Sequence, residues 1–353
     1  MLSLSPRGTA SGFWRYAAPV LALALTALTT GALFAAMGRP ALLTVTTFLI
    51  TPLLATGGLE ALLVKAAPLV MMGVGLSIAY RANVWNIGAE GQYIFGALAA
   101  GGLALALPAA PGWVIVPLLI AAGLVGGAGY ALIVAWLRTR FNANEILTSL
   151  MLAYVAQYLL VYLVTGPWRD PEGFGFPQTA LFSDAAGGPR LIEGSNLHLG
   201  LIFAPLIALA AWVMLGRSVL GFQFRVMGQA PRAARFAGFD ENRLIWLAMA
   251  ISGGLAGLAG MFEVTGNQGQ LTINLGPGYG FTAIIVGFLG RLHPLGVIPA
   301  GLLLALTYLG GDAAQMNLGL SSAITGIFQG ILLFCLLGSD VLISHRLQWK
   351  RRP

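Results

Sequence analysis

Residues 113–136 have the sequence WVIVPLLIAAGLVGGAGYALIVAW, a run of 24 residues in which no side chain is charged. A helix needs about 20 mostly apolar residues to cross the hydrocarbon core of a bilayer, so this run predicts a membrane-spanning helix. Its many glycines and alanines favour close helix–helix contact, because small side chains let two backbones approach each other in lipid.

Nine other apolar runs also approach the length of a spanning helix. They cover residues 16–37, 60–80, 85–107, 146–165, 198–216, 244–263, 271–290, 294–311 and 317–338. The sequence therefore predicts an all-α integral membrane protein in which residues 1–353 form a single transmembrane domain of about ten helices. The apolar stretch 41–58 contains Pro52 and Gly57-Gly58, so we interpret it as a re-entrant or surface segment rather than another span.

The composition of the whole chain agrees with this interpretation. Hydrophobic residues make up 58% of the chain and charged residues only 9%, whereas soluble domains are about a quarter charged. A water-soluble globule of this size would lack polar side chains for its surface. The net charge of +7 does not indicate nucleic-acid binding, because the basic residues are spread over the short gaps between apolar runs.

The positions of the basic residues predict the orientation in the membrane. If the N-terminus is cytoplasmic and ten helices alternate, 15 of the 19 lysines and arginines lie inside. The four outside are Arg39, Lys65, Arg169 and Arg190. This is a strong positive-inside bias, and counting 41–58 as a span would destroy it. We therefore expect both termini in the cytoplasm, a cytoplasmic loop at 217–243 and an extracytoplasmic loop at 166–197.

Several motifs of catalysis and cofactor binding are absent from the sequence. Neither of the two lysines, Lys65 and Lys350, follows a G-x-x-x-x-G stretch, so there is no phosphate-binding P-loop. The sequence also has no G-x-S-x-G, H-E-x-x-H, C-x-x-C or dinucleotide fingerprint. We expect no catalytic residue, metal site or cofactor on this chain, and any ATP that drives transport must be hydrolysed by another chain.

The segment Arg81–Gln92, with the sequence RANVWNIGAEGQ, places polar side chains at the mouth of a spanning helix. These are Asn83, Asn86, Glu90 and Gln92. A carboxylate inside a membrane segment is costly and usually has a partner or a cavity. The segment is therefore either a gate or pathway element, or a capped helix start in which Glu90 interacts favourably with the helix dipole.

Two further polar groups lie at predicted helix ends. Asn144 is a candidate N-cap with Glu145 in the first turn, and capping alone would explain it. Glu263, with the neighbouring Asn267, Gln268 and Gln270, precedes Gly276-Pro277-Gly278, which predicts a broken segment around 263–280. Polar groups beside interrupted helices indicate a substrate path, although an ordinary polar outer loop would have the same composition.

The inner loop contains the sequence GQAPRAARFAGFD at residues 228–240. Pro231 favours the first turn of a short helix, and Gly238 favours its end. Ala233, Ala234 and Ala237 would give this helix a small face between Arg232 and Arg235. Such a helix suits docking into a groove of another protein. The alternative is a basic helix that lies on anionic lipid.

Four segments resemble those of a known family. The stretch Tyr80–Gln92 closely resembles a segment typical of bacterial ABC importer permeases, in the nucleoside and simple-sugar group of the branched-chain amino acid and ribose permease superfamily. The stretch 144–152, the loop 228–239 and the stretch 281–294 are similar to further segments of that group. The resemblance extends from Pro68 to Gly311.

The loop departs from the family pattern at two positions. The residue before the proline is often Asn in this group and is Ala230 here, and Arg232 stands where the wider family has Glu. These departures affect the expected residue-by-residue contacts with the ATPase, not the expectation that the ATPase docks here. The resemblance implies that residues of this loop couple to it, namely Gly228, Pro231, Ala233, Ala234, Arg235 and Gly238.

The resemblance also implies a function and partners. It implies the permease subunit of an ATP-driven importer for nucleosides or related ribosyl or purine-like solutes, in the bacterial inner membrane. The expected partners are an ATP-binding subunit that carries ATP and Mg, a second permease as a related heterodimer partner, an extracytoplasmic solute-binding lipoprotein and membrane lipid, with no nucleic acid. The expected path or gate residues are Asn83, Asn86, Glu90, Gln92, Asn144 and Glu263. The alternatives are a permease for a simple sugar or branched-chain amino acid, and a stand-alone ion-coupled secondary transporter.

Overall fold

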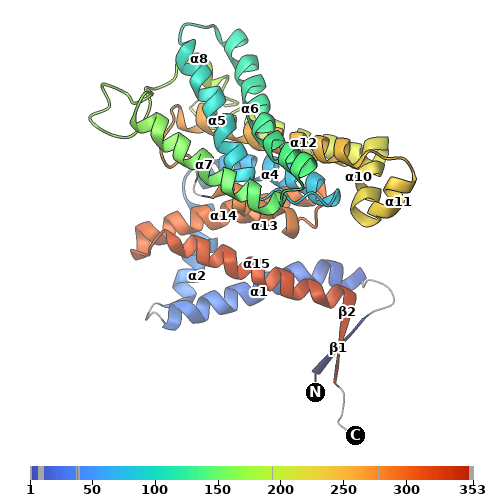
Figure 1. The fold of residues 1–353 in the computed structure, drawn as a ribbon. Helices are drawn as coiled ribbons and strands as arrows, with labels where there is room; N and C mark the ends of the chain where they lie inside the picture. Colours follow the sequence, from blue (N-terminus) through green and yellow to red (C-terminus); the bar gives the residue numbers. More distant parts are fainter. Residues whose placement is uncertain are drawn as a thin grey trace. The chain divides into compact units, whose positions relative to one another are not determined.

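The computed structural model describes residues 2–6, 12–36, 38, 40–192, 194–276 and 278–349 (Figure 1). The chain divides into two compact units. Unit 1 combines the N-terminal part up to Leu59 with the C-terminal part from Leu306, and unit 2 runs from Glu60 to Ala305. The regular secondary structure of the described residues is helical, apart from one pair of short strands and an isolated bridge between Gln178 and Thr272, and the described part of the loop 166–197 is largely irregular.

Unit 1 is built from helices of both chain ends. Its elements are β1 (Leu2–Pro6), α1 (Gly12–Ala36), α2 (Ala41–Leu49), α3 (Thr51–Leu54), the last part of α14 (Pro294–Leu318), α15 (Ala323–Ser344) and β2 (His345–Trp349). α1 packs against α15, where the Ser339 hydroxyl donates to the carbonyl oxygen of Ala18 at 3.0 Å. The rings of Phe48 and Phe328 stack with centroids 4.9 Å apart, and β1 pairs antiparallel with β2.

The stretch 41–58 does not form one continuous helix. α2 ends at Leu49, α3 covers only four residues around Pro52, and α4 begins at Gly58. Each of the two short helices is well below the length that crosses a bilayer, as we predicted for this stretch. Its depth in the membrane stays a prediction.

Unit 2 contains the helices that build the candidate site. They are α4 (Gly58–Arg81), α5 (Ala89–Ala106), α6 (Gly112–Phe141), α7 (Glu145–Thr165), α8 (Asp184–Gly187), α9 (Gly200–Arg217), α10 (Val219–Gln229), α11 (Pro231–Phe236), α12 (Glu241–Met261), the π-helix η1 (Phe262–Gln268), α13 (Tyr279–Leu289) and the first part of α14.

The centre of unit 2 is a group of three closely packed helices, α5, α6 and α12. A Cβ added to Gly96 of α5 would lie 2.2 Å from the Cα of Gly257 in α12. A Cβ added to Gly127 of α6 would lie 2.2 Å from the carbonyl oxygen of Gly253. Backbones can approach this closely only where side chains are absent, so these glycines determine how tightly the three helices pack.

Among the described residues, seven helices are long and apolar enough to cross a membrane. They are Ala17–Ala36, Gly58–Arg81, Gly112–Phe141, Glu145–Thr165, Gly200–Arg217, Glu241–Gln268 and Pro294–Leu318. Tyr279–Leu289 and Ala323–Ser339 are apolar but shorter. The structure therefore confirms an all-helical membrane fold, and the count of ten spans stays a prediction.

The predicted span 271–290 was too long, because it becomes helical only at Tyr279. Gly269 and Gly278 adopt left-handed backbone conformations with φ of 72° and 80°, and the described residues between them form no helix. This is the break that we predicted around 263–280. It leaves α13 preceded by an irregular segment instead of a full membrane-spanning length.

The two long loops of the sequence lie at opposite ends of α12. The loop 217–243 folds into α10 and α11, which lie beside the start of α12 (Figure 1). The loop 166–197 contains α8, which packs against η1 at the other end of α12.

Candidate functional site

The turn between α4 and α5 is shaped by Asn83. This residue has φ of 55°, a left-handed conformation that Asn tolerates better than most residues. Its side-chain oxygen accepts a hydrogen bond of 3.1 Å from the Trp85 indole N–H. The Trp85 ring contacts Tyr80 and Phe288, with ring centroids 5.1 and 6.4 Å away. Asn83 therefore orients a tryptophan that joins the turn to α13.

Asn86 and Gln92 form a buried pair of amides. The Asn86 Nδ2 donates to the Gln92 Oε1 at 2.7 Å, and the Gln92 Nε2 donates back to the Asn86 Oδ1 at 2.9 Å. The Asn86 Nδ2 also donates to the Ser252 hydroxyl of α12 at 3.0 Å. Both side chains are satisfied in the packed interior, where they join the turn to α5 and α12. Their predicted role in the path stays a prediction.

Glu90 joins α5 to the start of α13. Its carboxylate accepts hydrogen bonds from the backbone N–H groups of Gly278, at 3.2 Å, and Gly280. These N–H groups belong to the beginning of a helix, where the dipole favours a negative charge. The approach requires a glycine, because a Cβ on Gly280 would lie 2.2 Å from the Glu90 nitrogen.

A cavity of about 250 Å³ opens beside Glu90. Its lining comes from α5, α7, the irregular segment and α13, and consists of Glu90, Ala153, Tyr154, Gln157, Ile273, Asn274, Gly276, Gly278 and Phe281. α7 can approach α5 closely because a Cβ on Gly91 would lie only 2.7 Å from the Cα of Ala153. The lining combines two aromatic rings with a carboxylate and two amides, which suits a small polar solute with an apolar face.

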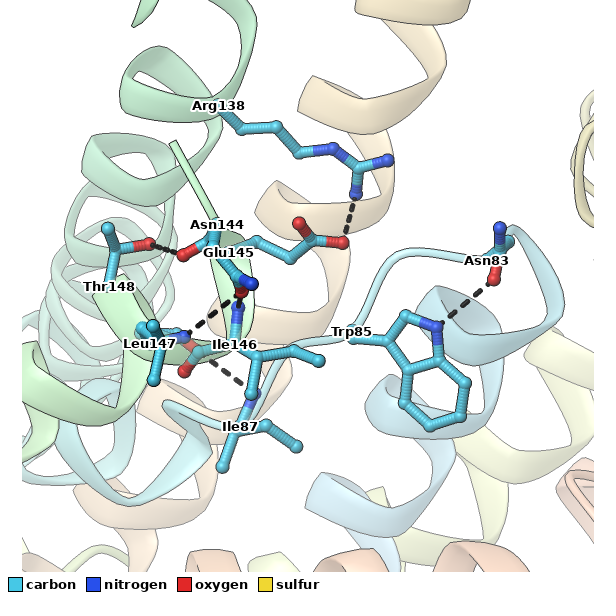
Figure 2. A network of polar contacts seen from close by, with 10 residues as sticks. Asn83, Trp85, Ile87, Arg138, Asn144, Glu145, Ile146, Leu147 and Thr148 are labelled. Atoms are coloured by element: carbon cyan, nitrogen blue, oxygen red, sulfur yellow. Dashed lines mark hydrogen bonds and ion pairs between the residues drawn. The ribbon is translucent and has the colours of Figure 1, made fainter. Parts of the chain in front are cut away.

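Asn144 has the capping role that we predicted (Figure 2). Its side-chain oxygen accepts from the backbone N–H groups of Ile146 and Leu147 at 2.9 and 3.3 Å. Glu145 forms a 2.7 Å ion pair with Arg138 at the end of α6. Asn144 is absent from the lining of the 250 Å³ cavity, so its predicted role in the path has no support from that cavity.

The start of α7 is also joined to the α4–α5 turn (Figure 2). The backbone N–H of Ile87 donates to the Ser149 hydroxyl at 3.1 Å. A Cβ added to Gly88 would lie 2.7 Å from the carbonyl oxygen of Ser149. The turn therefore contacts α7 as closely as it contacts α12.

Glu263 lies in η1 with the polar neighbours that the sequence placed beside it. Its Oε1 accepts from Asn267 at 2.7 Å and from Gln268 at 3.4 Å. Gln268 also donates to the carbonyl oxygen of Leu275 at 2.8 Å, whereas Gln270 pairs with Gln178 at 3.2 Å. Glu263 is buried and does not line the 250 Å³ cavity. Through Gln268, this polar group contacts the irregular segment between Gly269 and Gly278.

The loop 228–240 forms the short helix that we predicted. α11 begins at Pro231, and Gly238 follows it with φ of 78°. The Gly238 N–H donates to the Arg235 carbonyl oxygen at 3.0 Å, which closes the helix end. Ala234 is buried, whereas Phe236 is 97% exposed. The Arg235 guanidinium donates to Glu241 at 2.7 Å, and this hydrogen bond raises the pKa of Arg235.

Gly228 joins this loop to the α4–α5 turn. A Cβ added to Gly228 would lie 1.9 Å from the carbonyl oxygen of Arg81. The end of α10 therefore packs directly on the backbone where α4 ends.

Residues 58–337 match the family described as branched-chain amino acid transport system / permease component. The chain belongs to this permease family. The match covers most of the chain, including the α4–α5 turn, the cavity lining and α11. The family resemblance stated from the sequence is thereby confirmed.

Three relatives of this permease carry names of ABC transporter permeases. The glucose ABC transporter permease protein TsgB13 of Haloferax volcanii is 34% identical over 98% of this chain and 93% of that protein. The guanosine ABC transporter permease protein NupP of Bacillus subtilis is 28% identical over 78% and 79%. The nucleoside ABC transporter permease protein NupB of Lactococcus lactis is 26% identical over 76% and 75%. The permease is thus a multi-pass membrane protein of the ABC class.

The sequence identified one of the polar cavity residues of this permease and missed two. Glu90 was predicted, but Gln157 and Asn274 were not. Tyr154 was missed as well, although the spacing of Tyr154, Tyr158 and Tyr162 by four residues is visible in the sequence. Gln157 and Asn274 carry no comparable signal, because single amides in apolar runs are common.

Proposed function

We propose that this permease is the transmembrane subunit of an ATP-driven importer in the bacterial inner membrane, with ten spans and both termini cytoplasmic. It carries no catalytic residue, metal or cofactor of its own. A separate ATPase subunit, which binds ATP and Mg, docks at α11 through Pro231, Ala233, Arg235 and Gly238. A second permease subunit completes the path, and an extracytoplasmic solute-binding lipoprotein delivers the solute.

One observation carries this proposal, which is a continuous series of contacts from the α10–α11 loop to the cavity. Gly228 packs on the Arg81 carbonyl oxygen at the end of α4. The turn that follows is joined to α12 through Asn86 and Ser252. α5 then begins, and Glu90 joins it to the N-terminal end of α13 beside the cavity. We name this series, Gly228 to Arg81 to Asn86 to Glu90, the coupling relay.

The coupling relay supplies what an ATP-driven conformational change requires. ATP binding to a partner shifts the permease between two states only if the partner interacts differently with them. Each contact of the relay is a close backbone approach or a buried hydrogen bond, so a displacement of α10 must be passed on to the turn. The cavity then changes because α5 and α13 both contribute to its lining.

The solute we propose is a nucleoside or a related ribosyl or purine-like compound. The names of the guanosine and nucleoside permease relatives support it. A sugar is the second candidate, which the 34% identity to a glucose permease supports. The branched-chain amino acid alternative has only the description of the family in its favour. Membership of an ABC permease family leaves the ion-coupled alternative without support.

Docking of the ATPase is tested by changing α11. We expect the double substitution Arg235→Glu and Gly238→Asp to abolish co-purification of the ATPase and ATP-driven uptake, because it reverses the charge and strains the left-handed position. Arg169→Glu in the loop 166–197 is the matched control, since Arg169 is also exposed and lies at the other end of α12. Normal ATPase co-purification from the double variant would refute the docking assignment.

A further inference from the structure

Three tyrosines lie along one face of α7. Tyr154, Tyr158 and Tyr162 are spaced by four residues, which places them on the same side of a helix. Their exposed fractions are 53%, 72% and 65%. The opposite face is the buried one, and consists of Ser149, Ala153, Ala156, Leu160 and Val164. We call the three exposed rings the tyrosine face.

The aromatic belt of the membrane interface does not explain the tyrosine face. Tyrosines gather at the two ends of spanning helices, and Tyr162 near the end of α7 fits that rule. Tyr154 is the tenth residue of this 21-residue helix and so lies near its middle. A hydroxyl in the hydrocarbon core is costly when it lacks a hydrogen-bond partner.

The hydroxyls of the tyrosine face make no hydrogen bond within the described part of the chain. They therefore require water, solute or another chain as a partner, which lipid tails cannot supply. This requirement places the tyrosine face against an aqueous path or another chain rather than against hydrocarbon, and the position of Tyr154 in the cavity lining favours the path. The apolar residues Leu147 and Met151, which continue the same face toward the start of α7, need no such partner.

The tyrosine face is continuous with the cavity. Tyr154 and the adjacent Gln157 both line the cavity. Each step of four residues rises about 6 Å along a helix, so Tyr158 and Tyr162 extend from the cavity by about 12 Å. They extend toward Thr165, where α7 ends and the loop 166–197 begins. The three rings thus connect that end of the helix with the cavity.

The chemistry of this surface favours a planar ring. Exposed tyrosine rings offer flat apolar faces, on which heterocyclic bases of any identity stack. The polar side chains of the cavity are already partly engaged, because Glu90 accepts two backbone N–H groups. Gln157 donates to the Ile273 carbonyl oxygen at 3.2 Å. The remaining groups of Gln157 and Asn274 can pair with the polar edge of a base or with the hydroxyls of a sugar. Hydrogen bonding therefore does not distinguish the two solutes, and the flat faces of the tyrosine rings are what favours a planar ring.

We propose that Tyr154, Tyr158 and Tyr162 form a stacking surface along which a solute with a planar heterocyclic ring passes between the outer end of α7 and the cavity. This inference rests on the proposed transport function and adds the binding surface and the chemical class that it selects. Because the solute can stack on each ring in turn, it can move from one ring to the next without a deep free-energy minimum that would hold it at one site.

The test compares Tyr158→Leu with Tyr158→Phe in the complete transporter, reconstituted in lipid vesicles with its ATPase and partner subunits. We expect Tyr158→Leu to lower the initial rate of guanosine uptake about tenfold, because the planar face is lost. Tyr158→Phe keeps the ring and should restore most of that uptake. Ile146→Leu is the matched control, since Ile146 is 41% exposed on the same helix, lies about 120° around the helix from Tyr158 and does not line the cavity.

Three outcomes would overturn the inference. The first is uptake by Tyr158→Leu that equals the wild type, which would place the ring against lipid or another chain. The second is an equal loss in Tyr158→Leu and Tyr158→Phe, which would assign the effect to the hydroxyl. The third is glucose uptake that falls as much as guanosine uptake, which would exclude selection for planar rings.

A second measurement separates this inference from the proposed function. Azidoguanosine is photolysed with the assembled transporter, and the labelled peptides are identified by mass spectrometry. Labelling within 154–162 that guanosine suppresses supports the stacking surface even if ATP-driven uptake fails. Labelling that avoids α7 overturns the surface even if ATP-driven uptake is normal, in which case the proposed function stands without it.

Discussion

Gly228 of α10 and Arg81 of α4 meet backbone to backbone, so that a Cβ on Gly228 would lie 1.9 Å from the Arg81 carbonyl oxygen. The two residues are far apart in the sequence, and their contact joins the loop that we expect to dock the ATPase to the turn that leads into the cavity. The contact leaves no space for a side chain, so any substitution of Gly228 should disturb the coupling relay.

Substitution of this glycine should uncouple the permease. We expect Gly228→Ala to lose ATP-driven uptake because the added methyl group must push α10 away from α4, and overpacking of this kind costs about 1–3 kcal/mol. Uptake in lipid vesicles and the thermal unfolding temperature of the purified protein measure the two effects. Gly216→Ala is the control, since a Cβ there meets nothing within 4 Å. Equal uptake by the two variants would contradict the relay.

Glu90 should be required as a carboxylate rather than only for its size. In Glu90→Gln, one of the two backbone N–H groups at the start of α13 faces an amide NH₂ instead of an acceptor. A buried donor without an acceptor costs about 1–3 kcal/mol, so α13 should separate from α5 and uptake should fall more than about tenfold. The measurement is solute uptake by the variant. Its expression level and its co-purification with the ATPase are checked to equal those of the wild type.

The matched control for that substitution is Glu172→Gln. Glu172 is exposed in the loop 166–197 and does not line the cavity. It should transport as the wild type does. If Glu90→Gln also transported normally, the contact between α5 and α13 would not be needed for transport.

The buried amide pair should behave as one unit. We expect Asn86→Ala and Gln92→Ala each to destabilise the protein, and the double variant to cost less than their sum, because the first substitution already leaves the second amide without its partner. The coupling free energy should be about 1 kcal/mol or more. Thermal or denaturant unfolding of the four proteins in detergent measures it, and strict additivity would show that the two amides do not depend on each other.

Two glycines of α6 should respond in opposite ways to the same substitution. In Gly127→Ala the methyl group would lie 2.2 Å from the Gly253 carbonyl oxygen, so we expect a loss of about 1–3 kcal/mol. In Gly129→Ala it meets nothing within 4 Å, so we expect no loss, or a gain of up to about 1 kcal/mol from the better helix propensity of Ala. Unfolding temperatures compare them, and equal shifts would mean that the packing of α6 on α12 is looser than described.

Part of this architecture could be predicted because its signals are local. Apolar runs such as 113–136 indicate spanning helices from their length alone. The short helix after Pro231, its end at Gly238 and the Asn144 cap of α7 each depend on residues within a few positions of one another. For the same reason the polar neighbours of Glu263 were found together, since Asn267 is one helical turn away.

The cavity was predicted only at Glu90, because it is assembled from residues that the sequence keeps far apart. The hydrogen bond between Glu90 and Gly280 spans 190 positions, and no local pattern shows that α13 begins against α5. The same limit led to a predicted span at 271–290, where apolar composition favours a helix but the helix begins only after the left-handed Gly278.

The apolar runs of the linear chain are enough to identify a helical membrane protein, and its motifs indicate the permease family. A helix that spans lipid needs a long apolar run, and helix caps and turns depend on neighbouring residues. Both signals are therefore present in the linear chain. The packing of the helices, in contrast, is what pairs Asn86 with Gln92 and places Glu90 in a cavity with Tyr154 and Gln157. All these side chains are polar groups within apolar runs, and what distinguishes them is which helix packs beside them.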